Sequence, residues 1–327
     1  MIPGIALIVG NGLTKNLLER SGNPSLDSSR PLSLQFDVPF CSGMPWQAAF
    51  PLLASSLSEV MGSQPEIRDF DVFNALLTSS HPIMLDDQMR QYLAFAYSSL
   101  QAEMDLLDKE ATPWTDWLRS HRYFLRAVIS FNYDLLLEDL LSHTGIITKS
   151  PGVRITFNIK EDLRSMRITR DRSRLLLLKP HGSIGFAHHP RAVSMPTRTY
   201  PSTNVVTLNN TPLIRIPRNR LGCPRQEAYI VLPTEYSPYR GFQWVRPGYM
   251  EFARIANSIT HCVFLGLSYW ECDRAELNFI LDVLPSTTVI VEANPFPPAD
   301  FRSYVESSGR HYVHWEGDPL DISSTHM

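Results

Sequence analysis

The sequence predicts an α/β fold, in which a Rossmann-like, doubly wound and mostly parallel sheet carries a helical insertion. Short, wholly apolar runs recur along the chain, as is typical of strands covered on both faces. Most of these runs are followed by helical patterns, the alternation expected of parallel strands joined by crossovers. Several runs end in glycine, asparagine or histidine. We therefore predict one domain over residues 1–320 and a disordered tail over 321–327.

The first apolar run covers residues 5–9 and leads directly into a glycine-bearing turn, Gly-Asn-Gly-Leu-Thr, at 10–14. Glycines allow the backbone to turn tightly and approach a ligand, and the free N–H groups of a following helix suit phosphate. The complete G-x-G-x-x-G pattern is absent, because Lys15 stands where its third glycine would fall. Alone, the turn is a weak signal for nucleotide binding.

A long, mainly helical stretch follows, which we predict to be an insertion over about 44–126. Its longest helical pattern covers 84–110 and a shorter one lies around 70–77. The aromatic and methionine side chains are expected to form core, with an oligomer interface as the alternative. The polar loop at 22–37 either connects elements at the surface or folds over a ligand.

The next strand, at 127–129, gives way to a helical pattern from Leu135, and Asn132 and Asp134 lie between them. The turn that leaves the carboxyl end of a strand is where open α/β sheets bind ligands. The alternative for Asp134 is a purely local role as a helix cap, since Asp favours that position.

The middle of the chain adds another buried strand at 175–178, which ends in Lys-Pro-His-Gly-Ser and so places His181 at the same edge of the sheet. We also expect strands at 153–157 and 230–234, a solvated helix at 160–174 and a helix at 247–259. A contact of the 160–174 segment with a phosphate backbone is the alternative. A loop or small β insertion is expected over about 186–228. The adjacent His188 and His189 lack further ligands at metal-binding spacing.

The last third repeats the pattern of strand, turn and helix. A strand from Cys262 ends in a Gly-Leu-Ser turn, a helix covers 273–284, and a strand at 287–291 ends in Glu-Ala-Asn-Pro. A short helix from Ala299 and a strand at 311–315 complete the sheet.

Composition restricts the functional class. The 327 residues carry a net charge of −3, which disfavours a dedicated nucleic-acid-binding protein, so any role of nucleic acid is expected to be indirect. The four cysteines include no C-x-x-C pair, so neither a zinc ribbon nor another metal site is expected. We find no signal peptide and no apolar stretch that would span a membrane, and therefore predict a cytoplasmic protein.

Five strand ends thus offer glycine turns, a serine hydroxyl, asparagines, a glutamate and a histidine along one predicted edge. In this set and order the sequence resembles the sirtuin-like family, specifically its zinc-free branch of bacterial NAD-degrading defence proteins. The motifs are Gly-Asn-Gly at 10–12, Asn-Tyr-Asp at 132–134, His-Gly at 181–182, Gly-Leu-Ser with a later Asp at 266–273, and Asn294. The resemblance extends over 5–315.

The resemblance implies an NAD glycohydrolase that cleaves the nicotinamide–ribose bond of its substrate NAD. Asn132 would hold the ribose hydroxyls and orient water, His181 would act as a general base or positioner, and Asp134 would fix the geometry or stabilise developing positive charge. The residues implied for binding the rest of NAD are Gly10, Asn11, Gly12, Thr14, Gly266, Ser268, Asp273, Glu292 and Asn294.

Two other functions stay open at this stage. A protein deacylase would use the same NAD site, although the family's zinc-binding cysteine pairs and its Pro-Asp-Phe-Arg segment are absent and Asn11 replaces the usual alanine. A nucleotide-sensing or assembly subunit would bind NAD without turnover. Because an unregulated NADase harms its host, we expect a homo-oligomer or control by a partner such as a ring-forming ATPase or a sensor protein.

Overall fold

A computed structural model describes residues 4–20, 28, 30–34, 36–38, 43–63, 69–78, 82–155, 174–188, 198–199, 206–207, 213–223, 229–232, 242 and 244–322. A central seven-stranded sheet runs in the order β14-β13-β12-β1-β4-β7-β5, and every neighbouring pair is parallel. Its strands are β1 (Ile5–Val9), β4 (Leu125–Ser130), β5 (Thr148–Lys149), β7 (Leu175–Leu178), β12 (His261–Leu265), β13 (Val289–Ala293) and β14 (Tyr312–His314).

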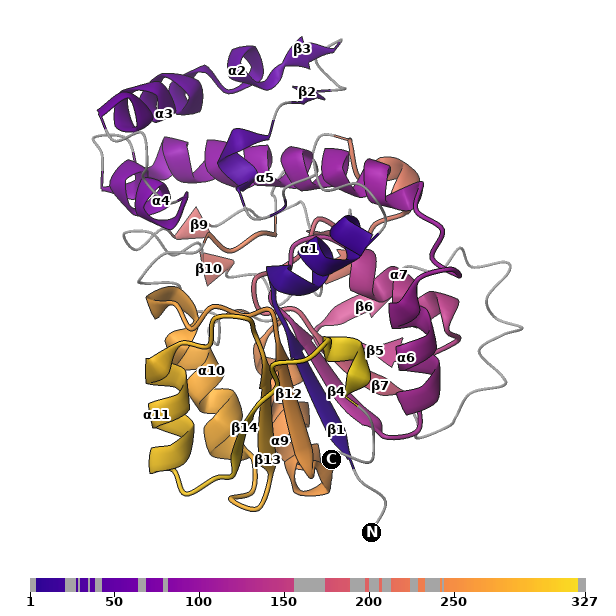
Figure 1. Ribbon diagram of the computed structural model, residues 1–327. Coiled ribbons are helices and arrows are strands. Elements are labelled where there is room, and N and C mark those ends of the chain that lie inside the picture. The colour runs from indigo at the N-terminus through magenta and orange to yellow at the C-terminus, as the bar shows by residue number, and fades with distance from the viewer. Residues whose placement is uncertain are drawn as a thin grey trace.

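Helices cover both faces of this sheet (Figure 1). The strand β1 shows why: Ile5, Leu7 and Val9 belong to one buried core, whereas Ala6 and Ile8 belong to the other. The first core includes apolar side chains of α1 (Asn11–Arg20), α6 (Pro113–His121) and α7 (Leu136–His143), and it continues into the helical layer described below. The second core is built with α9 (Arg246–Ile255), α10 (Glu271–Val283) and α11 (Ala299–Ser307). The predicted fold class, a doubly wound parallel α/β sheet, is confirmed.

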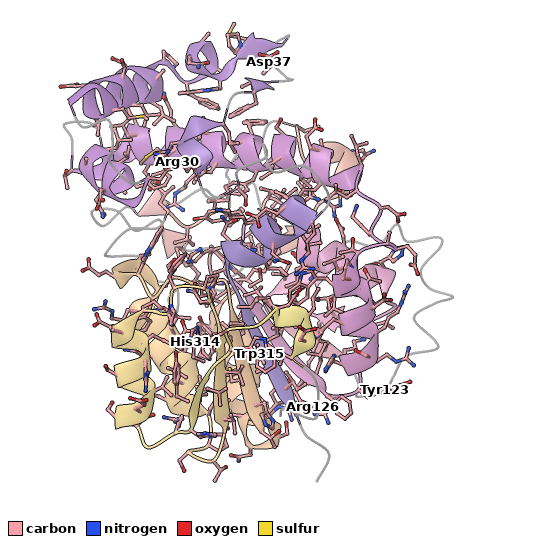
Figure 2. The ribbon with its side chains drawn as sticks, in the orientation of Figure 1. Arg30, Asp37, Tyr123, Arg126, His314 and Trp315 are labelled. Atoms are coloured by element: carbon pink, nitrogen blue, oxygen red, sulfur yellow. The ribbon has the colours of Figure 1, made fainter. Side chains whose placement is uncertain are left out.

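A helical layer lies beyond the carboxyl ends of the strands, on the side of the sheet where β1 passes into α1 (Figure 1). Its helices are α2 (Trp46–Ala49), α3 (Pro51–Ser63), α4 (Asp69–Leu77) and α5 (Pro82–Asp105). The apolar positions of α5 recur at helical spacing and are buried, including Met89, Leu93 and Leu100. Tyr123 and Arg126, beside the start of β4, lie at the opposite end of the sheet (Figure 2).

Smaller elements complete the described chain. The pair β2 (Asp37–Val38) and β3 (Met44–Pro45) is antiparallel, as is the pair β9 (Arg198–Thr199) and β10 (Val206–Thr207). A three-stranded sheet joins β6 (Val153–Ile155), β11 (Leu213–Arg215) and β8 (Phe186–His188). Single 3₁₀ turns are η1 (Pro31–Ser33), η4 (Arg218–Arg220), η6 (Ala256–Ser258) and η7 (Pro319–Asp321).

Three expectations from the sequence are corrected. The strand predicted at 153–157 is β6, which pairs in the small sheet, whereas the main sheet ends in the two-residue strand β5. At 230–234 the described residues form only an isolated bridge between Gly182 and Ile230. The boundary predicted for the disordered tail, residue 321, lies too early in the sequence. Ile322 is buried, and its carbonyl oxygen accepts a hydrogen bond from Trp117 Nε1.

Some expectations fall outside the described residues, namely the helix at 160–173, His189 and the tail at 323–327. None of the described helices combines the length and apolar character that crossing a membrane requires. Within the described ranges, no group of three or more His, Cys, Asp or Glu side chains is placed to hold a metal ion.

Candidate functional site

The turn after β4 is tied to the helix after β1 by a short relay of hydrogen bonds. Asn132 Nδ2 donates to Thr14 Oγ1 over 3.1 Å, and Thr14 Oγ1 donates to Asp134 Oδ2 over 2.9 Å. All three side chains are buried. The relay orients the carboxamide so that Asn132 Nδ2 is engaged, while Oδ1 accepts no hydrogen bond from any described residue. The amide oxygen is therefore the group that this turn offers to a ligand.

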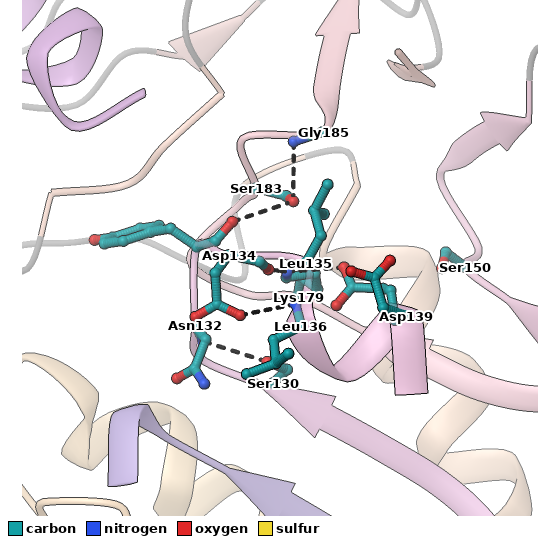
Figure 3. A network of polar contacts seen from close by, with 12 residues as sticks. Ser130, Asn132, Asp134, Leu135, Leu136, Asp139, Ser150, Lys179, Ser183 and Gly185 are labelled. Carbon is teal, nitrogen blue, oxygen red and sulfur yellow. Dashed lines mark hydrogen bonds and ion pairs between the residues drawn. The ribbon is translucent and has the colours of Figure 1, made fainter. Parts of the chain in front are cut away.

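Asp134 itself is buried, and both of its carboxylate oxygens accept hydrogen bonds. Figure 3 shows Asp134 in the polar network that it shares with the start of α7 and with Lys179. Oδ1 accepts from the backbone N–H of Leu136 at the start of α7 over 3.0 Å, and Oδ2 accepts from Thr14. Burial raises the pKa of Asp134, and the nearby ammonium of Lys179 opposes that rise. The helix-capping role considered from the sequence is thus present, and it is combined with the support of Asn132 through Thr14.

Lys179 is a buried cation that the sequence reasoning did not assign. Its Nζ donates to the carbonyl oxygen of Asp134 and, over 2.8 Å, to Glu138 Oε1 on α7. A buried ammonium is unfavourable without such partners, so these contacts hold the end of β7 against the Asn132 turn. A lysine directly before Pro-His-Gly is a signal that was available in the sequence.

His181 lies on the neighbouring turn, after β7, and is paired with a carboxylate from the far half of the chain. His181 Nε2 lies 2.7 Å from Asp273 Oδ1, and both side chains are buried. A neutral imidazole donates its Nε2 proton to this carboxylate, which leaves Nδ1 as the nitrogen that can accept a proton. Asp273, expected from the sequence to bind NAD, is thereby placed behind the histidine.

The residues on either side of Asn132 pack against the ring of His181. The Phe131 ring meets it edge-on with centroids 5.0 Å apart, and the Tyr133 ring is tilted with centroids 5.7 Å apart. The structure therefore brings the turn of Asn132 and the turn of His181 together at one sheet edge, as the parallel topology predicted.

The glycines of the first turn are required by close packing of two backbones. Gly266 has φ +59°, and a Cβ on it would lie 2.4 Å from the Cα of Gly12. A Cβ on Gly10 would lie 2.6 Å from the carbonyl oxygen of Gly266. The turns after β1 and β12 are thus pressed together, joined by a hydrogen bond of 3.0 Å from Gly12 N to Gly266 O. Asn11, partly exposed, begins α1 at this point.

The turns after β12 and β13 differ in how much they offer to a ligand. Ser268 is exposed, and the partly exposed Asn294 donates from Nδ2 to the carbonyl oxygen of Leu267 over 2.9 Å. Glu292 lies inside β13, where it is buried and accepts from Tyr312 Oη over 2.6 Å. Burial raises the pKa of Glu292, while the hydrogen bond from Tyr312 opposes the rise. Ser268 and Asn294 are therefore the accessible polar groups here.

Comparison with protein-family models found no match. Comparison with curated proteins found none either. Among solved structures, the chain is similar to one described as a Sir2 homolog–NAD complex, with 11% sequence identity and a TM-score of 0.42, over 97% of this chain and 85% of that one. At this degree of similarity, a functional assignment depends on the geometry of this chain.

Proposed function

We propose that this protein is an NAD glycohydrolase, which breaks the bond between nicotinamide and ribose to give ADP-ribose or its cyclic form. The observation that carries the proposal is that two neighbouring turns at one sheet edge carry Asn132, whose Oδ1 accepts from none of the residues the structure describes, and His181, which is held by a buried carboxylate. The motif resemblance to NAD-degrading sirtuin-like proteins points to the same substrate.

The reaction passes through a transition state with positive charge on the ribose, so the protein must hold the sugar and deliver water to one face. Asn132 Oδ1 accepts a hydrogen bond from a ribose hydroxyl, and Thr14 fixes the orientation of the amide. Asp134 supports Thr14, because both of its oxygens are already engaged by protein donors.

His181 acts on the ribose side of the bond. With Nε2–H directed at Asp273, Nδ1 takes a proton from water or from a ribose hydroxyl, and the carboxylate stabilises the imidazolium that results. General base catalysis of this type contributes about 10²–10⁴-fold in rate. Phe131 and Tyr133 limit the rotation of the ring.

The rest of the dinucleotide is assigned to the neighbouring turns. Gly10, Asn11 and Gly12 lie at the start of α1, where the positive end of the helix dipole suits the diphosphate, and Gly266 lies against them. The N–H groups of Gly10 and Gly12 themselves donate to the carbonyl oxygens of Leu265 and Gly266. We assign the exposed Ser268 to the diphosphate and the partly exposed Asn294 to the adenosine ribose. Thr14 and Asp273 belong to the support of Asn132 and His181, and Glu292 supports β13 through Tyr312.

The test is incubation of the purified chain with NAD, with and without an acylated lysine peptide, followed by chromatography. A glycohydrolase releases nicotinamide without the peptide. A deacylase consumes NAD only in step with the peptide, and a sensor leaves NAD intact while its melting temperature rises.

We further propose that this activity serves as a regulated, NAD-depleting effector in antiphage defence, in a homo-oligomer or with a partner ATPase or sensor protein. The resemblance and the toxicity of unregulated NAD loss support this proposal. Light scattering tests it: an isolated monomer that cleaves NAD at full rate would contradict it.

A further inference from the structure

We infer that helix α5 positions both catalytic turns through two buried side chains, Gln101 and Arg90, and so acts as a shared support for Asn132 and His181. This inference rests on the proposed function, since it assigns positioning residues to that reaction. Neither side chain belongs to a motif noted in the sequence. Both belong to α5, in the helical layer that lies beyond the sheet edge (Figure 1).

Gln101 holds the turn after β4. It is fully buried, and its Oε1 accepts from the backbone N–H of Leu135 over 2.7 Å. Leu135 follows Asp134 directly and precedes α7, so its N–H belongs to the group that a helix start leaves without an internal partner. Gln101 Nε2 donates to Asp105 and, over 3.3 Å, to Asp139 on α7. The side-chain amide of Gln101 therefore joins α5 to the residue that follows Asp134 and to the side chain of Asp139 on α7.

Arg90 holds the second turn through an intermediate segment, residues 229–232. Its guanidinium pairs with Asp86 on the same helix, from Nε over 2.7 Å and from Nη2 over 3.0 Å, and its Nη1 donates to the carbonyl oxygen of Ile230. The next residue, Val231, donates its N–H to the carbonyl oxygen of His181 over 2.8 Å. The guanidinium of Arg90 is thus connected to the backbone of His181 through two hydrogen bonds, one at Ile230 and one at Val231.

The contact between the 229–232 segment and the histidine turn is tight. Gly182 has φ +80°, and a Cβ there would lie 1.9 Å from the carbonyl oxygen of Tyr229. Ser183 N donates to the same oxygen over 3.0 Å. From the other catalytic turn, Tyr133 Oη donates to the carbonyl oxygen of Val231 over 2.5 Å. The segment lies between the two turns, so a displacement of α5 acts on both.

The test compares Gln101→Leu with a matched control, Gln88→Leu. Gln88 also lies on α5 and its Oε1 also accepts from a backbone N–H, that of Leu53 over 2.9 Å, but this bond stays within the helical layer. Because a small misplacement of reacting groups is costly while ligand contacts are untouched, we expect Gln101→Leu to lower kcat for NAD by about tenfold or more with KM changed less than about twofold. Gln88→Leu should keep the wild-type kcat.

Hydrogen exchange provides a readout that does not require turnover. In Gln101→Leu, amides in 131–137 should exchange faster than in Gln88→Leu. If Gln101→Leu does not fold, Arg90→Lys replaces it, because an ammonium cannot bind Asp86 with the guanidinium fork and reach Ile230 as well; amides in 181–184 and 229–232 are then the ones to exchange faster. A variant with wild-type kcat and wild-type exchange would overturn the inference. A wild-type chain that leaves NAD intact would instead refute the proposed function. The hydrogen-exchange comparison alone would then test whether α5 holds the two turns.

Discussion

Replacement of Thr14 by valine tests the hydrogen-bond relay that holds Asn132. Valine has nearly the same shape, so it removes the hydroxyl without opening a cavity. Two hydrogen bonds are lost, one to the carboxylate of Asp134 and one from the amide of Asn132, and both partners stay buried.

The expected loss of stability follows from these two bonds. A hydrogen bond to a charged group contributes about 1.5–3 kcal/mol and a neutral one about 1 kcal/mol, so Thr14→Val should lower the free energy of unfolding by roughly 2.5–4 kcal/mol. For a chain of this size that corresponds to a fall in Tm of about 4–6 °C. Since the Asn132 amide is then free to rotate, we expect kcat for NAD to fall by about 10-fold to 100-fold.

The assay is a melting curve together with chromatography of NAD, and the control is Thr288→Val. Thr288 is also fully buried, but its hydroxyl makes a single neutral bond of 2.9 Å to Ile259, next to the start of β13. The control should lose about 1 kcal/mol and keep full activity. Thr14→Ser should restore both properties. Equal stability and activity in Thr14→Val and the wild type would refute the relay.

Three further predictions follow from the site and its surroundings. Asp273→Asn should lower kcat by about 10²–10⁴-fold, because the amide no longer fixes the tautomer of His181; chromatography of NAD measures this, and an unchanged rate would exclude the pair from the mechanism. Gly266→Ala should cost about 2–5 kcal/mol, because alanine is strained at φ +59° and its Cβ would overlap Gly12; denaturant unfolding measures this, and a neutral result would contradict the close packing. The contacts with Arg254 and Lys149 lower the pKa of Glu251 to about 2, below the ordinary value of about 4.3 in an unfolded chain, so the stability they contribute is present above pH 4.3 and lost as the pH falls through about 2. Glu251 is partly exposed, so Glu251→Gln should cost less than about 1 kcal/mol at pH 7 and nothing at pH 2, and a difference that grows on acidification would contradict this sign.

Much of the fold follows from local pattern. The runs at 5–9, 175–178 and 289–291 are apolar at every position because both faces of the sheet are covered, and this composition is visible without a structure. A local pattern does not identify the partner of a strand, so the pairing of β6 in the small sheet was not predictable. The strand β5 was missed because Thr148-Lys149 is too short and too polar to give a signal.

The candidate site, like the fold, could be predicted from the sequence only in part. Parallel topology alone placed Asn132 and His181 at one edge. The partners of these residues were not predictable, because Thr14 and Asp134 are 120 positions apart and His181 and Asp273 are 92 apart. Only the fold shows that Thr14 and Asp273, two expected ligand contacts, hydrogen-bond to Asn132 and His181, the residues that we propose to act on the ribose.

The most direct test of the central claim is the rate of NAD cleavage by Asn132→Ala and His181→Ala, measured by chromatography beside a melting curve. The exposed histidine variant His311→Ala, at the amino end of β14, serves as the control. We predict that both site variants remain folded and lose NAD cleavage, while His311→Ala keeps it. Retained cleavage by a folded His181→Ala or Asn132→Ala variant would contradict the proposed mechanism.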